Sequence, residues 1–259
     1  MATVKKLSVF IEMVESQIKK NPRNSLWFRG IGMSKKFKLI PSVYRHKKKT
    51  VPELIAVETD MLERFGELST TYTKGLVQDN WDRLFFMQHH RVPTRLLDWS
   101  VNPFVALYFA LTEAKNLKSN ENPAVCILDP IKWNELSMSH VSFQGEVLKK
   151  DSEFLKPYQP TKVLTDIKTM PKNPLAIYGN RNSDRMVVQN GKFVLFGNDD
   201  KPMDKYDFSK KCLKKIEFDK KAIVGLIDSL FKIGITPAAV YPDLEGIAKE
   251  LRHEFGFGA

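Results

Sequence analysis

Apolar residues recur at helical spacing along several long stretches of the chain, with polar residues between them. The first stretch covers residues 4–20 and ends at Asn21-Pro22, a pair that stops a helix. Its apolar positions are Leu7, Phe10, Ile11, Val14 and Ile18. The same spacing predicts further helices over residues 52–68, 81–89, 104–115, 220–231 and 244–255. The pattern therefore indicates a protein rich in amphipathic helices.

Shorter apolar runs, rich in β-branched and aromatic residues, lie between these helices and predict strands. They cover residues 26–31, 95–99, 124–130, 176–178 and 214–218. Residues 185–197 predict two further strands about Asn190-Gly191, a dipeptide that favours a tight hairpin turn. We therefore expect an α+β fold with a mixed, mostly antiparallel central sheet packed with several helices.

The 259 residues are expected to form a single domain. Residues 131–174 differ from the rest, because they contain four prolines and few periodic apolar positions. An irregular insertion over one edge of the fold is the prediction for this segment.

The chain carries 41 basic and 30 acidic residues, which gives a net charge of +11. A charge of this sign favours polyanionic partners such as nucleic acid. The lysines are spread over short clusters, however, and such clusters are commonly solvated surface. Charge alone therefore leaves nucleic-acid binding and an ordinary basic surface open.

No apolar run approaches the ~20 residues that a membrane-spanning helix needs, and the first residues lack the apolar core of a signal peptide. We expect a cytoplasmic protein with no membrane partner. Cys126 and Cys212 lack metal-ligand spacing, and the adjacent His89 and His90 cannot easily share one metal ion. No metal is expected.

Polar chemistry is concentrated in residues 88–110, directly beside an apolar run. This segment reads Gln88-His89-His90-Arg91-Val92-Pro93-Thr94-Arg95-Leu96-Leu97-Asp98-Trp99-Ser100 and then enters a helix that begins at Pro103. Ser100 or Asn102 is expected to cap that helix. A strand that delivers Asp98 next to a helix N-terminus would suit a phosphate-bearing ligand. The alternative is that Asp98 and Arg95 form a buried ion pair, and that the histidines are core or rim residues.

These residues resemble the FRG domain family. Its members carry an aromatic-Arg-Gly motif near the start and a Gln-His…Pro-Thr…Leu-Leu-Asp-Trp segment that continues into Ala-Leu-Tyr-Phe-Ala. The first motif is Trp27-Phe28-Arg29-Gly30 in this chain, and the second lies within residues 88–110. Residues 185–193, 232–235 and 241–248 resemble later motifs, so the resemblance covers about residues 20–250. We expect a polar pocket built from Arg29, Gln88, His89, Arg95, Asp98 and Gln189, with His90, Thr94 and Trp27 as further ligand-binding residues.

The order of the motifs is also similar, more distantly, to the ADP-ribosyltransferase superfamily, which implies a core of that type and NAD as the cofactor. In the arginine-bearing branch, the first strand ends in aromatic-Arg-Gly, a middle strand carries Ser or Thr, and a late strand supplies Glu or Gln. By this resemblance, Arg29 would hold the NAD pyrophosphate, Ser100 would position the nicotinamide ribose and Gln189 would bond a ribose hydroxyl. Because an amide cannot stabilise developing positive charge as a carboxylate does, catalysis would need an acid such as Asp98 or Glu146.

Three hypotheses remain open from the sequence. The favoured one is recognition of a nucleotide, NAD or nucleic acid in the polar pocket, with ADP-ribosyl transfer in a toxin or phage-conflict setting as the implied activity. The second is a non-catalytic module that binds nucleotide or nucleic acid. The third treats the polar block as the framework of an unusual core. Turnover of a small nucleotide separates the first from the second, and salt-dependent affinity for nucleic acid separates the second from the third.

Overall fold

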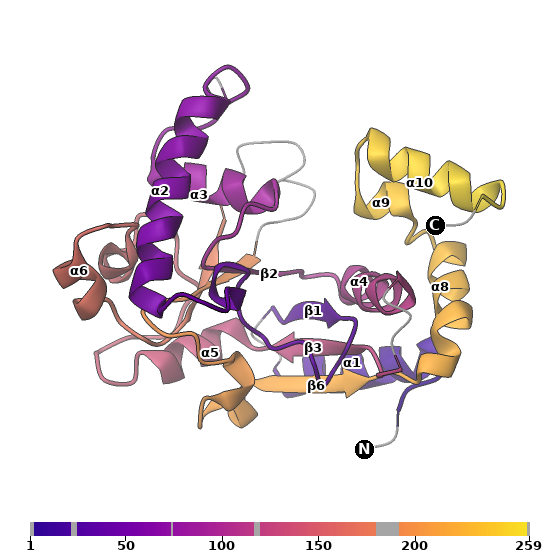
Figure 1. Ribbon diagram of the computed structural model, residues 1–259. Coiled ribbons are helices and arrows are strands. Elements are labelled where there is room, and N and C mark those ends of the chain that lie inside the picture. Colours follow the sequence, from indigo (N-terminus) through magenta and orange to yellow (C-terminus); the bar gives the residue numbers. More distant parts are fainter. Residues whose placement is uncertain (1–2, 22–24, 74, 117–119, 180–191, 258–259) are drawn as a thin grey trace. The chain divides into compact units, whose positions relative to one another are not determined.

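The structure of the chain is a computed structural model that describes residues 3–21, 25–73, 75–116, 120–179 and 192–257 (Figure 1). It combines helices with antiparallel strands, so the predicted α+β class is confirmed. The strands of the described residues form two three-stranded sheets, where the sequence indicates one central sheet. Each sheet belongs to a compact unit of its own. The first unit comprises Met1–Phe37, Ser100–Asp129 and Leu213–Ala259, and the second comprises Lys38–Trp99 and Pro130–Cys212.

The first unit is built on a sheet with the strand order β1-β3-β6, in which both pairings are antiparallel. Its strands are β1 (Trp27–Ile31), β3 (Ala124–Leu128) and β6 (Leu213–Glu217). Its helices are α1 (Leu7–Lys20), α4 (Pro103–Asn116), α8 (Ile223–Lys232), α9 (Pro237–Val240) and α10 (Leu244–Glu254), with a 3₁₀ turn η5 (Lys220–Ala222) before α8. One face of the sheet packs with α1, α4 and α8 into a shared hydrophobic core.

Helix α4 lies closely against β1, and Gly30 makes this close approach possible. A Cβ atom at Gly30 would lie 2.0 Å from the Ala106 carbonyl oxygen and 2.6 Å from the Ala110 nitrogen. Ala106 and Ala110 are themselves small and buried. The glycine of the aromatic-Arg-Gly motif therefore has a packing role, because no larger residue fits between this strand and this helix.

The N-terminus of α4 is capped by Asn102, one of the two residues that the sequence nominates. Its side-chain oxygen accepts hydrogen bonds from the backbone N–H groups of Phe104 (2.9 Å) and Val105 (3.3 Å). The other nominee, Ser100, accepts a hydrogen bond from the backbone N–H of Asn102 through its hydroxyl oxygen at 3.0 Å. Ser100 thus shapes the turn that precedes the helix.

The second unit is built on a sheet with the strand order β2-β5-β4, again antiparallel throughout. Its strands are β2 (Leu96–Trp99), β4 (Leu175–Tyr178) and β5 (Lys192–Leu195). Its helices are α2 (Val51–Ser69), α3 (Asn80–His89), α5 (Pro130–Ser137) and α6 (Leu164–Thr169), with 3₁₀ turns η1 (Val43–Arg45), η2 (Glu153–Tyr158), η3 (Met203–Lys205) and η4 (Ser209–Lys211). A separate hydrophobic core joins α2, α3 and all three strands.

Residues 131–174, for which an irregular insertion is predicted, combine short helices with longer segments that have no regular secondary structure. They contain most of α5 and all of η2 and α6. The Trp133 side chain is fully buried, and its indole N–H donates to the Pro174 carbonyl oxygen at 2.8 Å. Asn134, also fully buried, accepts from the Ala176 N–H at 2.7 Å and donates to the Ala176 carbonyl at 2.8 Å. The segment is held by side-chain to backbone hydrogen bonds, which leave no periodic pattern in a sequence.

The other predicted helices and strands that lie in described residues are confirmed to within a few residues at their ends. Of the hairpin predicted about Asn190-Gly191, only β5 is described, and residues 185–191 lie outside the described part of the chain. The short helix α9 is not anticipated by the sequence pattern, because a helix of a single turn has too few residues to show a period.

Across the described residues, no helix combines the length and the apolar composition that crossing a membrane requires. Within the same residues, no group of three or more His, Cys, Asp or Glu side chains is placed to hold a metal ion.

Candidate ligand-binding site on the second unit

Asp98 lies near the end of a buried strand, with its own side chain exposed. In β2, Leu96, Leu97 and Trp99 are buried and Asp98 alone is exposed. Asp98 is opposite Phe193 of β5, and the Phe193 ring stacks on Phe85 of α3 at a centroid distance of 5.3 Å. Side chains of paired residues share one face of a sheet, so Asp98 leaves the same sheet face that packs against α3.

A chain of side-chain hydrogen bonds orients the Asp98 carboxylate. The Gln88 amide nitrogen donates to Asp98 Oδ2 at 2.5 Å, and the Thr94 hydroxyl donates to Gln88 Oε1. Thr94 Oγ1 in turn accepts from the Leu96 backbone N–H at 3.2 Å. Thr94 is buried and Gln88 is half-buried, so this chain runs from the protein interior to an exposed carboxylate. The three side chains are all predicted site residues, and the fold brings them together.

The turn after α3 places a basic residue in a strained backbone conformation. Arg91 has a φ of 62°, the left-handed region that costs a non-glycine residue about 1–2 kcal/mol. Hydrogen bonds from Arg91 N to the Gln88 carbonyl (3.0 Å) and from Val92 N to the Met87 carbonyl (2.9 Å) hold this turn. Because glycine would relieve the strain, an exposed arginine at this position points to a role for its side chain.

The two histidines lie on the same turn as Arg91. His89 is half-buried and His90 is exposed, and their rings meet edge to face at a centroid distance of 4.9 Å. The His90 ring also stacks against Phe86 at 6.3 Å. Sequence reasoning did not single out Arg91, although a bulky residue at the end of a helix, where glycine is common, is a usable signal.

Arg95 does not belong to an accessible pocket, and here the structure does not support the predicted ligand role. Its side chain is completely buried, and its Nε donates to Glu58 Oε2 at 2.6 Å while its backbone N donates to Glu58 Oε1 at 2.5 Å. The guanidinium also donates to the Tyr158 carbonyl at 3.0 Å. Burial lowers the pKa of the Arg95 guanidinium, but the Glu58 carboxylate, together with Tyr44 and Tyr158, outweighs this effect and holds that pKa above its ordinary value. The alternative pairing of Arg95 with Asp98 is therefore wrong.

Glu58 is a residue that sequence reasoning missed. It lies on α2 between Leu54 and Leu62, at helical spacing on the face that is buried. A carboxylate in that position needs a buried cation, because an unpaired charge in the core would cost several kcal/mol. The interruption of an apolar helix face by one acidic residue was the available signal.

Arg29, Trp27 and Ser100 belong to the first unit. Arg29 is half-buried on β1 opposite Cys126, and Trp27 on the same strand is 1% exposed. Phe28 and Ser100 pair through two backbone hydrogen bonds, Phe28 N to Ser100 O (2.7 Å) and Ser100 N to Phe28 O (2.8 Å). This pairing places the Arg29 and Ser100 backbones beside each other. Since side chains alternate along a strand, those of Arg29 and Ser100 leave opposite faces of the paired strands.

Gln189 lies outside the described residues, and the structure therefore gives no position for it. Glu146, the other acid that the sequence nominates, is an exposed residue of the second unit. Its backbone carbonyl accepts a hydrogen bond from Asn134 at 2.7 Å. A pocket that joins Arg29, Asp98 and Gln189 stays a prediction.

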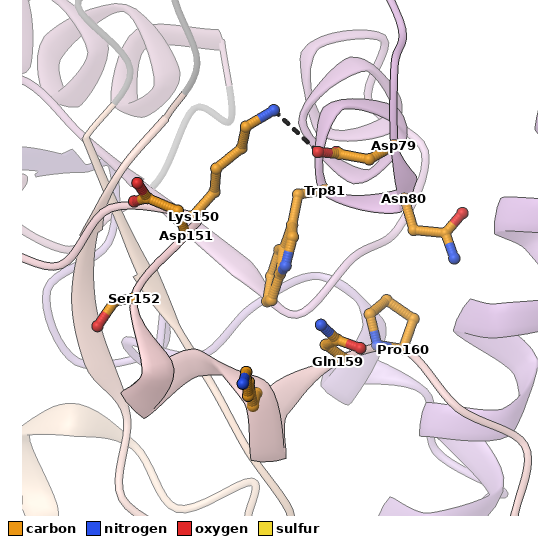
Figure 2. A pocket seen from close by; sticks show the side chains of 9 residues that line it. Asp79, Asn80, Trp81, Lys150, Asp151, Ser152, Gln159 and Pro160 are labelled. Carbon is orange, nitrogen blue, oxygen red and sulfur yellow. Dashed lines mark hydrogen bonds and ion pairs between the residues drawn. The ribbon is translucent and has the colours of Figure 1, made fainter.

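A pocket of about 390 Å³ opens in the second unit where α3 begins, at the other end of the helix from Gln88 (Figure 2). It is lined by Asp79, Asn80, Trp81, Lys150, Asp151, Ser152, Lys156, Gln159 and Pro160, and so by none of the predicted site residues. Lys150 Nζ lies 2.9 Å from Asp79 Oδ2 and 2.8 Å from the buried Asp82 Oδ1. Lys156 pairs with Glu153 at 2.6 Å. Because both lysines are paired with carboxylates, this pocket has no clear preference for an anion.

Comparison with known protein families matches residues 24–119 to the FRG domain. The match contains the aromatic-Arg-Gly motif and the whole segment of residues 88–110, so the resemblance carried by those two motifs is confirmed. The three later motifs lie beyond the matched residues. No curated protein and no solved structure matches the chain. Residues 24–119 are thus similar to the FRG domain, and the ligand has to be inferred from the chemistry of the site.

Proposed function

We propose that this protein recognises a nucleotide through its FRG domain, with NAD as the first candidate. The observation that carries the proposal is the hydrogen-bonded chain from Thr94 through Gln88 to the exposed Asp98 carboxylate. An oriented carboxylate at the surface is suited to accept hydrogen bonds from the hydroxyl groups of a ribose or from an amino group of a base. Binding sites need such preorganised groups, because a side chain already fixed loses little entropy when the ligand arrives.

The basic side chains of the same segment supply the complementary half of a nucleotide site. His89, His90 and Arg91 follow Gln88 directly, and an arginine guanidinium matches the geometry of a phosphate. In the proposed complex, Asp98 binds the ribose and Arg91 binds a phosphate group. The left-handed backbone conformation of Arg91 would direct its guanidinium towards the ligand. Backbone strain of this kind is common at ligand sites.

ADP-ribosyl transfer is the activity that we propose for NAD bound in this way, in a toxin or phage-conflict setting. The bond between the nicotinamide nitrogen and C1′ of the ribose breaks, and nicotinamide leaves with the bonding electron pair. A nucleophilic O–H or N–H group of the acceptor forms a new bond to C1′ and releases its proton to the solvent. By the resemblance to the ADP-ribosyltransferases, Arg29 would hold the pyrophosphate and Gln189 would bond a ribose hydroxyl. Ser100 leaves the opposite strand face from Arg29 and would act only through the turn that it forms before α4. Asp98 is the acid that would stabilise the positive charge that develops on the ribose.

A second candidate function is a non-catalytic nucleic-acid-binding module, and it is favoured by the net charge of +11. Lys47, Lys48 and Lys49 form an exposed basic cluster of the second unit. Such a cluster would neutralise phosphates, and the resulting affinity would fall steeply as salt is added.

Incubation of the purified protein with labelled NAD, in the presence of RNA, single-stranded DNA or a cell lysate, tests the proposed activity. We expect nicotinamide release and transfer of label to one class of acceptor, with both lost in Arg29→Ala and Gln189→Ala. The matched control is Lys232→Ala, which removes a charge from an exposed position on α8. If the folded wild-type protein turns over no NAD with any acceptor, the transferase proposal is wrong, and a salt-dependent titration with nucleic acid then tests the binding module.

A further inference from the structure

Helix α10 is attached to the first unit by one face only. Gly246 is its only residue that is buried, and a Cβ atom there would lie 1.9 Å from the Tyr241 carbonyl oxygen. On the same side, Glu250 accepts hydrogen bonds from the Thr236 hydroxyl (2.5 Å) and the Ala238 N–H (2.9 Å). The His253 ring meets Phe231 of α8 at a centroid distance of 4.4 Å. Figure 1 shows the result, with α10 lying beside α9 at the yellow end of the ribbon.

The opposite face of α10 is an apolar stripe that is exposed to solvent. Leu244 is 85% exposed, Leu251 49% and Phe255 68%, and Ile247 at the edge of the stripe is 49% exposed. With Ala248, these residues follow the spacing of four, three and four residues that forms the seam of a coiled coil. A contiguous apolar stripe of this kind marks an interaction surface. The seam positions are Leu244 (d), Ala248 (a), Leu251 (d) and Phe255 (a).

The charges beside this seam indicate what covers it. Glu245 and Arg252 are seven residues apart, so both occupy position e of the heptad, on the same flank of the stripe. When two such helices pair antiparallel, the e residues of one helix face the e residues of the other. Two copies of α10 centred on each other then place Glu245 opposite Arg252 of the other copy, twice by symmetry. We propose that α10 pairs antiparallel with α10 of a second copy of this chain.

Antiparallel pairing forms ion pairs between the two helices, and parallel pairing does not. In a parallel pair, position g of one helix faces position e of the next heptad, which sets the apolar Ile247 opposite Arg252 and forms no ion pair. Glu245 already pairs with Lys249 of its own helix at 2.7 Å, and its carboxylate has acceptor sites for both cations. A two-fold axis through the centre of the helix pair makes the interface isologous, which is the commonest form of dimer.

The size of the surface sets the expected affinity. Eleven helical residues span about 16 Å, so the helix pair buries less than the roughly 800 Å² per partner of a standard interface. We therefore expect a weak dimer that forms in the micromolar range and dissociates on dilution. The inference does not depend on the proposed function, because α10 lies outside the residues matched to the FRG domain.

Sedimentation velocity of the full chain over a series of micromolar concentrations tests the proposal. The wild-type protein is expected to shift from monomer to dimer as its concentration rises. Leu251→Asp places a charge in the seam and should leave a monomer at every concentration. Val224→Asp, which changes an exposed apolar residue of α8 that is 73% exposed, is the matched control and should dimerise like the wild type.

Charge reversal separates this arrangement from general hydrophobic association. Glu245→Arg alone and Arg252→Glu alone each place like charges opposite each other, so each variant should dimerise at least about tenfold more weakly than the wild type. An equimolar mixture of the two variants should form a heterodimer, because every facing pair then has opposite signs. A wild type that stays monomeric overturns the proposal, as does a mixture that dimerises no better than its components. Circular dichroism of each variant confirms that it is folded.

Discussion

Replacing Glu58 with Gln should lower the free energy of unfolding by about 3–5 kcal/mol, the cost of leaving one partner of a buried ion pair uncompensated. Both oxygens of Glu58 accept hydrogen bonds from Arg95, one from Nε and one from the backbone N–H. A glutamine amide has only one acceptor oxygen, so one Arg95 donor would face an NH₂ group. The Arg95 side chain is completely buried, so water cannot take the place of the lost carboxylate.

Chemical denaturation of the wild type and of three variants measures this effect. Glu63→Gln is the control, because Glu63 lies on the same helix but its pair with Lys162 is exposed and screened by water, and its unfolding midpoint should barely change. The double variant Glu58→Leu with Arg95→Met removes both charges and should be less destabilised than Glu58→Gln. An unchanged midpoint for Glu58→Gln would contradict the structural role assigned to this pair.

Gly30→Ala should destabilise the protein by about 3 kcal/mol, at the upper end of typical overpacking costs. The added methyl group would meet two backbone atoms of α4 at 2.0 and 2.6 Å, and backbone inside a helix cannot move aside as a flexible side chain can. The strand β1 and the helix α4 would therefore have to separate.

The control for Gly30→Ala is Gly225→Ala. Gly225 lies on α8 with no atom within 4 Å of a Cβ at that position, so alanine there should stabilise the helix by about 0.5–1 kcal/mol. Thermal unfolding of the two variants should shift in opposite directions. Equal shifts of the two unfolding temperatures would contradict the packing role that we assign to Gly30 between α4 and β1.

The local structure of this protein is largely predictable from its sequence, because it depends on local signals. The cap by Asn102 and the apolar spacing of α2 each concern residues within a few positions of one another. The division of the strands into two sheets is not predictable in the same way. It depends on pairing between distant segments, such as β1 with β3, that the apolar pattern of each strand does not encode.

In the candidate site, too, the residues marked by local sequence signals could be predicted, and those that depend on tertiary packing could not. Asp98 could be nominated because a lone acid ends an apolar strand, and Gln88 and Thr94 because they lie in the same motif. The partner of Arg95 could not, because Glu58 precedes it by 37 residues and reaches it only through tertiary packing. A buried arginine and an accessible one look the same in a motif, since the motif records which residues are present and not which of them face the ligand.

The measurement that tests the central proposal most directly is calorimetric titration of NAD into the wild-type protein and Asp98→Asn. Loss of a charged acceptor should weaken binding about tenfold or more, since hydrogen bonds to charged groups contribute about 1.5–3 kcal/mol. Asp166→Asn makes the same change at an exposed position of α6 and should bind as the wild type does. We predict that the wild type binds NAD tightly and that only Asp98→Asn loses this binding. Equal affinity of the wild type and Asp98→Asn would contradict the proposal. The same holds if the folded wild type does not bind NAD.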